Sequence, residues 1–310
     1  MVFTGIGKYT GTVKKTFAIK AYSIATLENN KISVSIDDSY KYVKGGVKPE
    51  PVVMFGSVML TKGKDYTVSY KNNAKVNDGL VTKTAPRVTV TGKGNFSGSY
   101  TVYFAIEKQD FELLTMIVAD KTYTKKINAY KSTPVIKDLN GKTLKAGTDY
   151  EKAFMYTYKT DTVVRNGKTD VTRLAGDVVH KNDIVPANTV LIVTAIGKGN
   201  YTNNILTAEY RVTTAAISKA TVTVPKQTYA GKAIEPGTDE IVVKMGKTVL
   251  TTDDYEITSY SNNVKKGTAM LTIKGKGNYG GTKTVKFTIQ AKKMIWYWDI
   301  VTMSFKLREV

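Results

Sequence analysis

The chain contains no cysteine and a single histidine, His180, among its 310 residues. Without thiols it can form neither a disulfide framework nor a metal site built from thiolate ligands. One histidine cannot build a histidine metal cluster, and a Ser-His-Asp triad would have to use His180, which we expect in an exposed turn. The sequence therefore predicts no catalytic residues, no cofactor and no metal site.

Arginine is scarce for a basic chain, although the formal net charge is +20 from 46 basic and 26 acidic residues. A field of this size attracts polyanions such as nucleic acid, anionic lipid or the anionic polymers of a cell wall. Arginine is the residue that binds phosphate through paired hydrogen bonds, whereas scattered lysines on strands are typical of solubility and edge protection. We therefore expect no specific nucleic-acid partner, and we favour weak contacts with cell-wall polymers or glycans.

Long apolar runs are also missing. No stretch approaches the ~20 apolar residues of a membrane-spanning helix, so no transmembrane segment is expected. Apolar and polar residues alternate instead, most clearly in residues 284–289, where Val285, Phe287 and Ile289 share one face. The same alternation in residues 269–273 precedes a glycine-rich loop, so the two runs predict a β-hairpin. We expect almost no helix.

Four copies of a glycine-rich segment, which we call the glycine corners, stand out against this background. They are residues Gly5–Gly11, Gly92–Gly98, Gly197–Asn203 and Gly275–Gly281. Their third residues are 87, 105 and 78 residues apart. A catalytic site is normally built once, whereas a segment used four times is typical of a structural element that every repeat needs. The last copy matches a dinucleotide-binding pattern, but a strand and not a helix follows it. We therefore place the corners on hairpin tips, where glycine serves chain reversal.

Other sequence features recur together with the glycine corners. A tyrosine opens each unit, at Tyr42, Tyr123 and Tyr229, and an Asp-Tyr pair follows with its tyrosine 24, 27 and 26 residues later. The last unit has one extra residue before its Asn262–Asn263 pair, which predicts a β-bulge or a lengthened turn there. Each unit thus contains roughly five to seven short strands with regular turn signals, a pattern typical of a two-sheet β-sandwich.

These landmarks divide the chain into five parts. Complete repeats are predicted over residues 21–107, 108–213 and 214–291. Residues 1–20 look like the C-terminal hairpin of a truncated repeat, and because a lone hairpin is marginally stable in water, we expect the chain to be part of a longer one. Residues 292–310 form an atypical aromatic tail that holds both tryptophans. For this tail an aromatic anchor, the start of another module and an altered end of the reading frame stay open.

The second repeat carries an insertion near residues 156–186. Its Asp-Tyr pair and its glycine corner are 49 residues apart, against 28 and 22 residues in the other two repeats. Long loops on a rigid sandwich are common recognition surfaces, but insertions are also simply tolerated at such places. If this region binds a ligand, the candidate residues are Tyr156, Tyr158, Arg165, Arg173 and His180.

The third repeat carries a resemblance to a known family. The segments concerned are Tyr229–Pro236, Asp254–Ile257, Ser261–Asn263, Gly267–Ala269 and Ile273–Tyr279. They resemble the tandem immunoglobulin-like repeats of large cell-surface and secreted proteins of Firmicutes, and the resemblance extends over about residues 21–291. It implies an all-β fold of tandem immunoglobulin-like β-sandwich repeats in series, extracellular spacer or adhesin modules, and no catalytic residues. The insertion and the lack of a sortase-type anchor depart from the family and leave the mode of attachment open.

Three function classes follow. We expect non-enzymatic extracellular spacer or stalk modules of a bacterial surface protein, with weak adhesion to anionic wall polymers. The alternative is a carbohydrate-binding or host-adhesion module that uses the second-repeat insertion. A hydrolase with paired carboxylates is the third hypothesis. The expected location is extracellular or at the cell surface, and the first residues contain no apolar core of a signal peptide.

Overall fold

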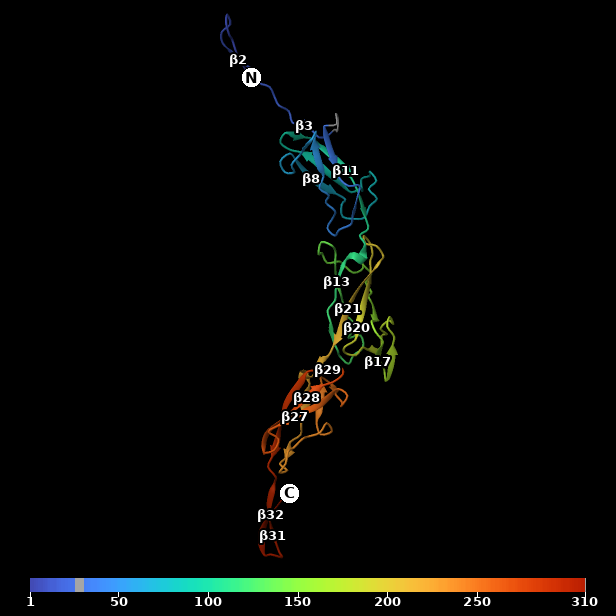
Figure 1. The fold of residues 1–310 in the computed structure, drawn as a ribbon, viewed down its shortest axis with the longest axis vertical. Coiled ribbons are helices and arrows are strands. Elements are labelled where there is room, and N and C mark those ends of the chain that lie inside the picture. Colours follow the sequence, from blue (N-terminus) through green and yellow to red (C-terminus); the bar gives the residue numbers. More distant parts are fainter. Residues whose placement is uncertain (26–30, 310) are drawn as a thin grey trace. The chain divides into compact units, whose positions relative to one another are not determined.

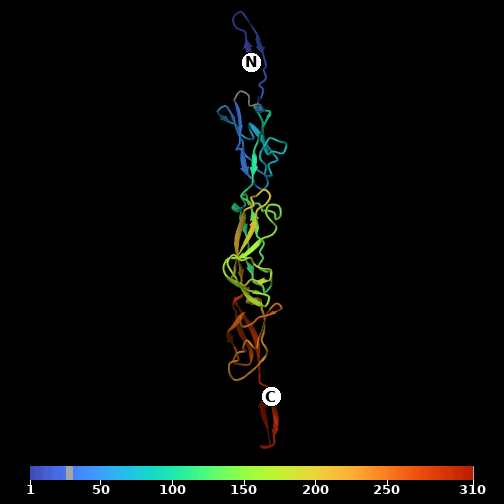
Figure 2. The ribbon, with the colours of Figure 1, turned by 90° about the vertical axis from the view of Figure 1, so that its right-hand side faces the viewer.

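The computed structural model describes residues 1–25 and 31–309. Residues 26–30 of the predicted first repeat and Val310 of the tail lie outside the described residues. The chain is all-β, and its described helices are two three-residue 3-10 turns, η2 (Phe111–Leu113) and η3 (Ile217–Lys219). Figures 1 and 2 show strands and connecting loops throughout. The predicted fold of tandem immunoglobulin-like β-sandwich repeats with almost no helix is confirmed.

The strands follow in chain order, grouped by the predicted parts of the chain. The N-terminal hairpin contains β1 (Val2–Thr4) and β2 (Thr12–Lys14). The first repeat contains β3 (Tyr22–Ser23), β4 (Ile32–Ser35), β5 (Ser39–Lys41), β6 (Val52–Phe55), β7 (Val58–Met59), β8 (Tyr66–Lys71), β9 (Arg87–Gly92), β10 (Phe96–Ser97), β11 (Ser99–Tyr103) and β12 (Ala105–Glu107). The second contains β13 (Thr115–Ile117), β14 (Lys121–Thr122), β15 (Val135–Lys137), β16 (Met155–Tyr158), β17 (Thr162–Asn166), β18 (Thr169–Arg173), β19 (Asp183–Ile184), β20 (Val190–Ile196) and β21 (Ile205–Thr213).

The third repeat and the tail complete the series. The third repeat contains β22 (Ala215–Ala216), β23 (Thr221–Thr223), β24 (Gln227–Thr228), β25 (Val242–Met245), β26 (Thr248–Val249), β27 (Tyr255–Ser261), β28 (Gly267–Gly275), β29 (Tyr279–Gly280) and β30 (Thr282–Gln290). The tail contains β31 (Met294–Asp299) and β32 (Ser304–Glu309).

The first and third repeats have the same two-sheet arrangement. The first pairs β4–β6–β7 in one sheet and β11–β9–β8 in the other, and the third pairs β23–β25–β26 and β24–β30–β28–β27. The second repeat has the sheets β14–β21–β20–β16 and β13–β15, and its insertion adds the sheet β18–β17–β19. Each repeat therefore buries apolar side chains between two layers of strands, as the alternating sequence pattern predicts.

The alternation of the last hairpin is confirmed in detail. Along β30, Phe287 and Ile289 are buried and Val285 is half-buried, while the residues between them are exposed. Strand β28 pairs with β30 in antiparallel register, and in Figure 1 β28 runs beside β27. The β27–β28 register shifts between Ile257 and Ser259, so the predicted bulge is present. The extra residue is Thr258, whose hydroxyl donates a hydrogen bond to the carbonyl oxygen of Thr272 at 3.2 Å.

The chain divides into two compact units that do not follow the predicted repeat boundaries. The first unit contains residues 1–115, 136–153 and 195–206, and the second contains residues 116–135, 154–194 and 207–310. The second predicted repeat is thus shared between the units, because one end packs with the first repeat and the other end with the third. The boundaries of the repeats stay a prediction.

All four glycine corners lie in hairpin connections, as predicted. Gly7, Gly94, Gly199 and Gly277 have φ values of 69°, 65°, 68° and 57°. This left-handed backbone is accessible to glycine at no steric cost, which explains why the third residue of each corner is glycine. The corner thus reverses the chain between two strands, in all four copies.

The two ends of the chain both form hairpins. Strands β1 and β2 pair in antiparallel register, and all of their residues are exposed. In the tail, β31 pairs with β32, Trp298 packs edge-on against Phe305 at 4.9 Å between ring centroids, and Arg308 lies 5.0 Å from the centre of the Tyr297 ring. The aromatic residues of the tail therefore stabilise a strand pair of their own.

Replacing a corner glycine by alanine tests the role of the left-handed turn. Gly277→Ala should cost about 1–2 kcal/mol, because the added Cβ meets only Asp253 O at 3.7 Å and the penalty comes from the backbone conformation. Gly199→Ala should cost more, because its Cβ would lie 2.6 Å from Thr148 O. Hydrogen exchange of the peptides around each corner measures the local loss of stability. Equal effects of the two variants would contradict this ranking.

Candidate functional site

The first joint between repeats is built by the glycine corner of the second repeat. Asn200 Oδ1 accepts a hydrogen bond from the backbone N–H of Val76 at 3.1 Å. Tyr201 packs edge-on against Tyr42, the opening tyrosine of the first repeat, with 5.4 Å between ring centroids and an interplanar angle of 88°. Tyr201 is 0% exposed and Tyr42 5% exposed. All of these residues belong to the first compact unit.

The second joint repeats this arrangement within the second compact unit. Asn278 Oδ1 accepts from the backbone N–H of Ala187 at 2.8 Å. Tyr279 packs edge-on against Tyr123, with 5.8 Å between ring centroids and an interplanar angle of 86°. The Asn-aromatic part of the corner therefore contacts the preceding repeat, while its glycines turn the chain.

Sequence reasoning recognised these residues as landmarks but missed the contact between them. The pairing joins residues far apart in the chain, such as Tyr42 and Tyr201. The usable signal was that an opening tyrosine and a corner aromatic recur together in consecutive repeats. Tyr229, the third opening tyrosine, is 38% exposed, which fits a position where no corner is packed on it.

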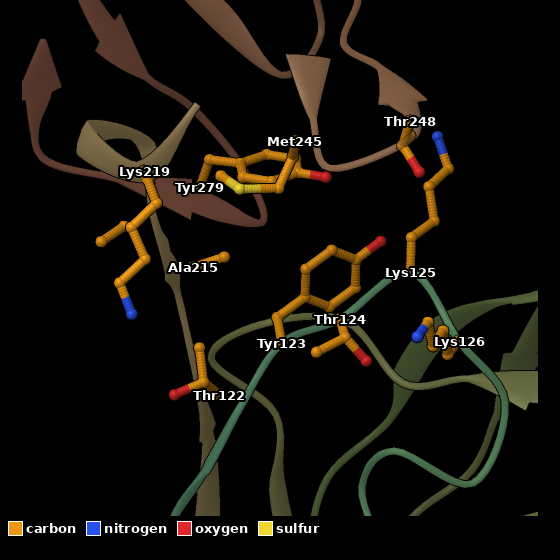
Figure 3. A pocket seen from close by; sticks show the side chains of 11 residues that line it. Thr122, Tyr123, Thr124, Lys125, Lys126, Ala215, Lys219, Met245, Thr248 and Tyr279 are labelled. Carbon is orange, nitrogen blue, oxygen red and sulfur yellow. The ribbon is translucent and has the colours of Figure 1, made fainter. Parts of the chain in front are cut away.

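A pocket lies beside the second joint (Figure 3). Its volume is about 290 Å³. Tyr123, Tyr279 and Met245 form one wall, and Lys125, Lys126 and Lys219 project from the surrounding segments. The lining residues are Thr122, Tyr123, Thr124, Lys125, Lys126, Ala215, Ala216, Lys219, Met245, Thr248 and Tyr279, none of them acidic.

The insertion of the second repeat is organised around a buried carboxylate, Asp183, which is 0% exposed. Arg173 donates two hydrogen bonds to it, from Nε at 3.1 Å and from an Nη at 2.8 Å. Tyr158 donates its hydroxyl at 3.0 Å, and Asn166 Nδ2 and the backbone N–H of His180 donate at 2.7 and 3.1 Å. Burial alone would raise the pKa of Asp183, but the hydrogen bonds from Arg173, Asn166, His180 and Tyr158 outweigh it and hold the pKa below its ordinary value.

The five predicted ligand residues thus occupy different environments. Tyr158 and Arg173 hold Asp183, and burial is the main cause that raises the pKa of the Tyr158 hydroxyl. Tyr156 is buried and donates its hydroxyl to Ser132 O at 3.0 Å, as Tyr70 and Tyr260 do to proline carbonyls in the other repeats.

The remaining two candidates are exposed. Arg165 pairs with Asp170 at 3.0 Å across the β17–β18 hairpin. His180 lies in the loop before β19, with an exposed side chain, as expected for a turn histidine. The structure therefore does not gather the five residues into one open site, and ligand binding by them stays a prediction.

Neither a metal cluster nor a membrane-spanning helix occurs in the described part of the chain. Within residues 1–25 and 31–309, no group of three or more His, Cys, Asp or Glu side chains is placed to hold a metal ion. None of the helices in these residues has the length and apolar character needed to cross a membrane.

Comparison with known proteins shows similarity in solved structures alone. No protein-family model and no curated protein matches the chain. The chain is similar to Protocadherin Gamma B2 extracellular cadherin domains 3–6, with 11% identity, a TM-score of 0.19, and coverage of 86% of this chain and 76% of that chain. It is also similar to the Protocadherin gammaB7 EC3-6 cis-dimer structure, with 10% identity, a TM-score of 0.20, and coverage of 86% of this chain and 76% of that chain. A third similar structure is Escherichia coli alpha-2-macroglobulin activated by porcine elastase, with 9% identity, a TM-score of 0.19, and coverage of 81% of this chain and 26% of that chain. The fold assignment rests on the sheets described above.

Removing the buried carboxylate should destabilise the insertion. Asp183→Ala leaves Arg173 without its partner, and breaking a buried pair of this kind costs about 3–5 kcal/mol. Arg165→Ala, which breaks an exposed pair, should cost less than about 1 kcal/mol. Urea unfolding followed by hydrogen exchange of residues 156–186 compares the two variants. Similar losses in both would show that Asp183 does not organise the insertion.

The lowered pKa of Asp183 also predicts a pH dependence. The stability that its ionised form contributes is present above the unfolded pKa of about 3.9, and it is lost as the pH falls through the lower pKa of the folded state. Acid titration of the wild type should therefore begin to destabilise the insertion as the pH falls below ~4. In Asp183→Ala, this acid-dependent step should be absent.

Proposed function

We propose that these repeats are non-enzymatic extracellular spacer modules of a bacterial surface protein, held in series by the Asn-aromatic corners. The observation that carries the proposal is the joint that occurs twice with the same parts. A module built for catalysis needs a single pocket with positioned reactive groups. In this chain the recurring side chains instead form the contact between neighbouring repeats.

The physical basis of each joint is burial combined with a satisfied backbone donor. Burying a large side chain contributes about 1.5–3 kcal/mol relative to leaving it exposed. The asparagine side chain accepts a backbone N–H of the preceding repeat, Val76 in one joint and Ala187 in the other. Because an unsatisfied buried donor costs roughly 1–3 kcal/mol, displacing the corner is opposed by polar as well as apolar contacts. Each joint thus stabilises the contact between two repeats within its own compact unit.

Adhesion to anionic polymers is a second part of the proposal. The net charge of +20 attracts polyanions, and this attraction is screened beyond about 10 Å at 0.1 M salt. Cell-wall polymers and anionic glycans are therefore the partners that the charge favours, with binding that weakens as salt rises. The alternative, a carbohydrate-binding or host-adhesion module, would use the accessible part of the insertion, Arg165 and His180.

The joint is tested by removing its aromatic contact. In Tyr42→Ala, the ring that packs on Tyr201 is lost, so the first repeat should tumble independently of the residues that follow it. NMR relaxation of backbone amides in the full chain measures this as a shorter rotational correlation time for residues 31–107 than in the wild type.

Tyr229→Ala is the matched control, because Tyr229 is the equivalent opening tyrosine but is 38% exposed. It should leave the correlation times unchanged. If the wild type already shows independent tumbling of the first repeat, the spacer proposal fails.

A further inference from the structure

The two joints differ in how one lysine is neutralised. Lys44 and Lys125 are equivalent, because each stands two residues after the opening tyrosine of its repeat. In the first joint, the Lys44 ammonium group pairs with Asp149, whose side chain is 6% exposed. The backbone N–H of Lys44 donates to Asp138 Oδ2 at 3.1 Å. The positive charge of this joint is thus matched by carboxylates of the following repeat.

The second joint has a methionine where the first has one of these carboxylates. In the second repeat the carbonyl of Ile136 accepts the backbone N–H of Leu144 at 2.8 Å, and in the third repeat the carbonyl of Val243 accepts that of Leu250 at 2.9 Å. Asp138 and Met245 each lie two residues after the accepting residue. This shared hydrogen bond aligns the two strands. A neutral thioether therefore stands in the place of a negative charge.

The other carboxylate of the second joint accepts hydrogen bonds within its own turn, as Asp149 does from the backbone N–H of Lys145 at 2.8 Å, but it forms no salt bridge with Lys125 among the described residues. This carboxylate is Asp254, which is equivalent to Asp149 because each belongs to an Asp-Tyr pair. Asp254 accepts hydrogen bonds from the backbone N–H of Thr251 at 3.1 Å and from the Thr251 hydroxyl at 3.4 Å. Among the salt bridges of the described residues, none involves the lysines of the pocket, Lys125, Lys126 and Lys219. Three ammonium groups thus border a pocket that has no acidic lining residue.

Two buried phenol groups face the same pocket. Tyr123 and Tyr279 are 6% and 4% exposed, and neither hydroxyl has a hydrogen-bond partner in the described part of the chain. In Figure 3, both hydroxyl oxygens lie on the side of the pocket where Lys125 and Thr248 are found. Burial first, and then the negative charge of the nearby Asp254, raise the pKa of Tyr123 to about 12 and also raise that of Tyr279, so both hydroxyls stay protonated donors at neutral pH. Neither hydroxyl is among the fully buried, unpartnered polar atoms of the described residues, so each is open to the pocket and can donate to a bound acceptor.

We infer that this pocket binds the acidic group of an anionic glycan. The lysine ammonium groups supply the positive charge, and the tyrosine hydroxyls donate hydrogen bonds to a carboxylate or phosphate oxygen. Met245 offers an apolar surface to the carbon atoms of the sugar. The inference rests on the proposed adhesion to anionic polymers and assigns that adhesion to the second joint.

The test measures binding of small probes to the full chain by isothermal titration and by NMR signals of the tyrosine rings. Trigalacturonate carries carboxylates, glycerol phosphate carries a phosphate, and maltotriose is a neutral control. At low salt, one or both anionic probes should bind and shift the signals of Tyr123 and Tyr279, and maltotriose should not. The tighter of the two probes identifies the acidic group.

Two variants separate the pocket from the general charge of the protein. Lys125→Ala/Lys126→Ala/Lys219→Ala should weaken binding about tenfold or more, because several charge-assisted contacts are lost. Tyr123→Phe/Tyr279→Phe keeps both rings and should also weaken binding about tenfold, through loss of the hydroxyl donors alone. As a control with the same change in net charge, three exposed lysines elsewhere in the third repeat, Lys265, Lys266 and Lys286, are replaced by alanine. This control should stay within about twofold of the wild type.

Other outcomes overturn the inference. Equal losses in the two triple lysine variants, or a wild type that binds neither anionic probe, would remove the pocket as a site. A long anionic polymer tested alongside keeps the two proposals distinguishable. If the polymer binds the wild type and all variants equally well, the proposed charge-driven adhesion is supported and the pocket is rejected as the binding site. If the polymer does not bind the wild type, the adhesion proposal itself fails.

Discussion

The contact between a corner aromatic and the opening tyrosine of the preceding repeat is the interaction on which the structure depends. Each corner combines a glycine with positive φ, which turns the chain, with an asparagine and an aromatic residue that leave the turn and contact the neighbouring repeat. The Tyr42–Tyr201 and Tyr123–Tyr279 pairs bury four rings that would otherwise be exposed at the ends of the sandwiches. One short segment thus serves both the fold of its own repeat and the connection to the next.

The same design explains why the second repeat is divided between the two compact units. Its glycine corner packs against the first repeat, and its opening tyrosine receives the corner of the third. A repeat that is clamped at both ends shares its contacts with two neighbours, as nearest-neighbour coupling in repeat proteins requires. The difference between the joints is electrostatic: Asp138 and Asp149 engage Lys44 in one, whereas Met245 leaves Lys125 unneutralised in the other.

The insertion shows how a sandwich carries extra chain without losing its core. Its strands form a separate small sheet, and the carboxylate of Asp183 joins this sheet to β16 through the hydroxyl of Tyr158. The guanidinium of Arg173 on β18 holds the same carboxylate within the small sheet. Three of the residues that we predicted as ligand contacts, Tyr156, Tyr158 and Arg173, make internal hydrogen bonds. Sequence reasoning identified them by their chemistry, which a buried network and a binding surface have in common.

Local patterns along the chain were enough to determine the all-β fold, the hairpins at the glycine corners and the bulge near Thr258, because strand alternation and turn chemistry act between residues close in sequence. Only the tertiary structure decided which side chains meet across a joint and which face solvent. Tyr42, Tyr123 and Tyr229 occupy equivalent sequence positions, yet two are buried and one is exposed. The reason is physical: burial depends on what packs against a residue, and the packing partner comes from another repeat.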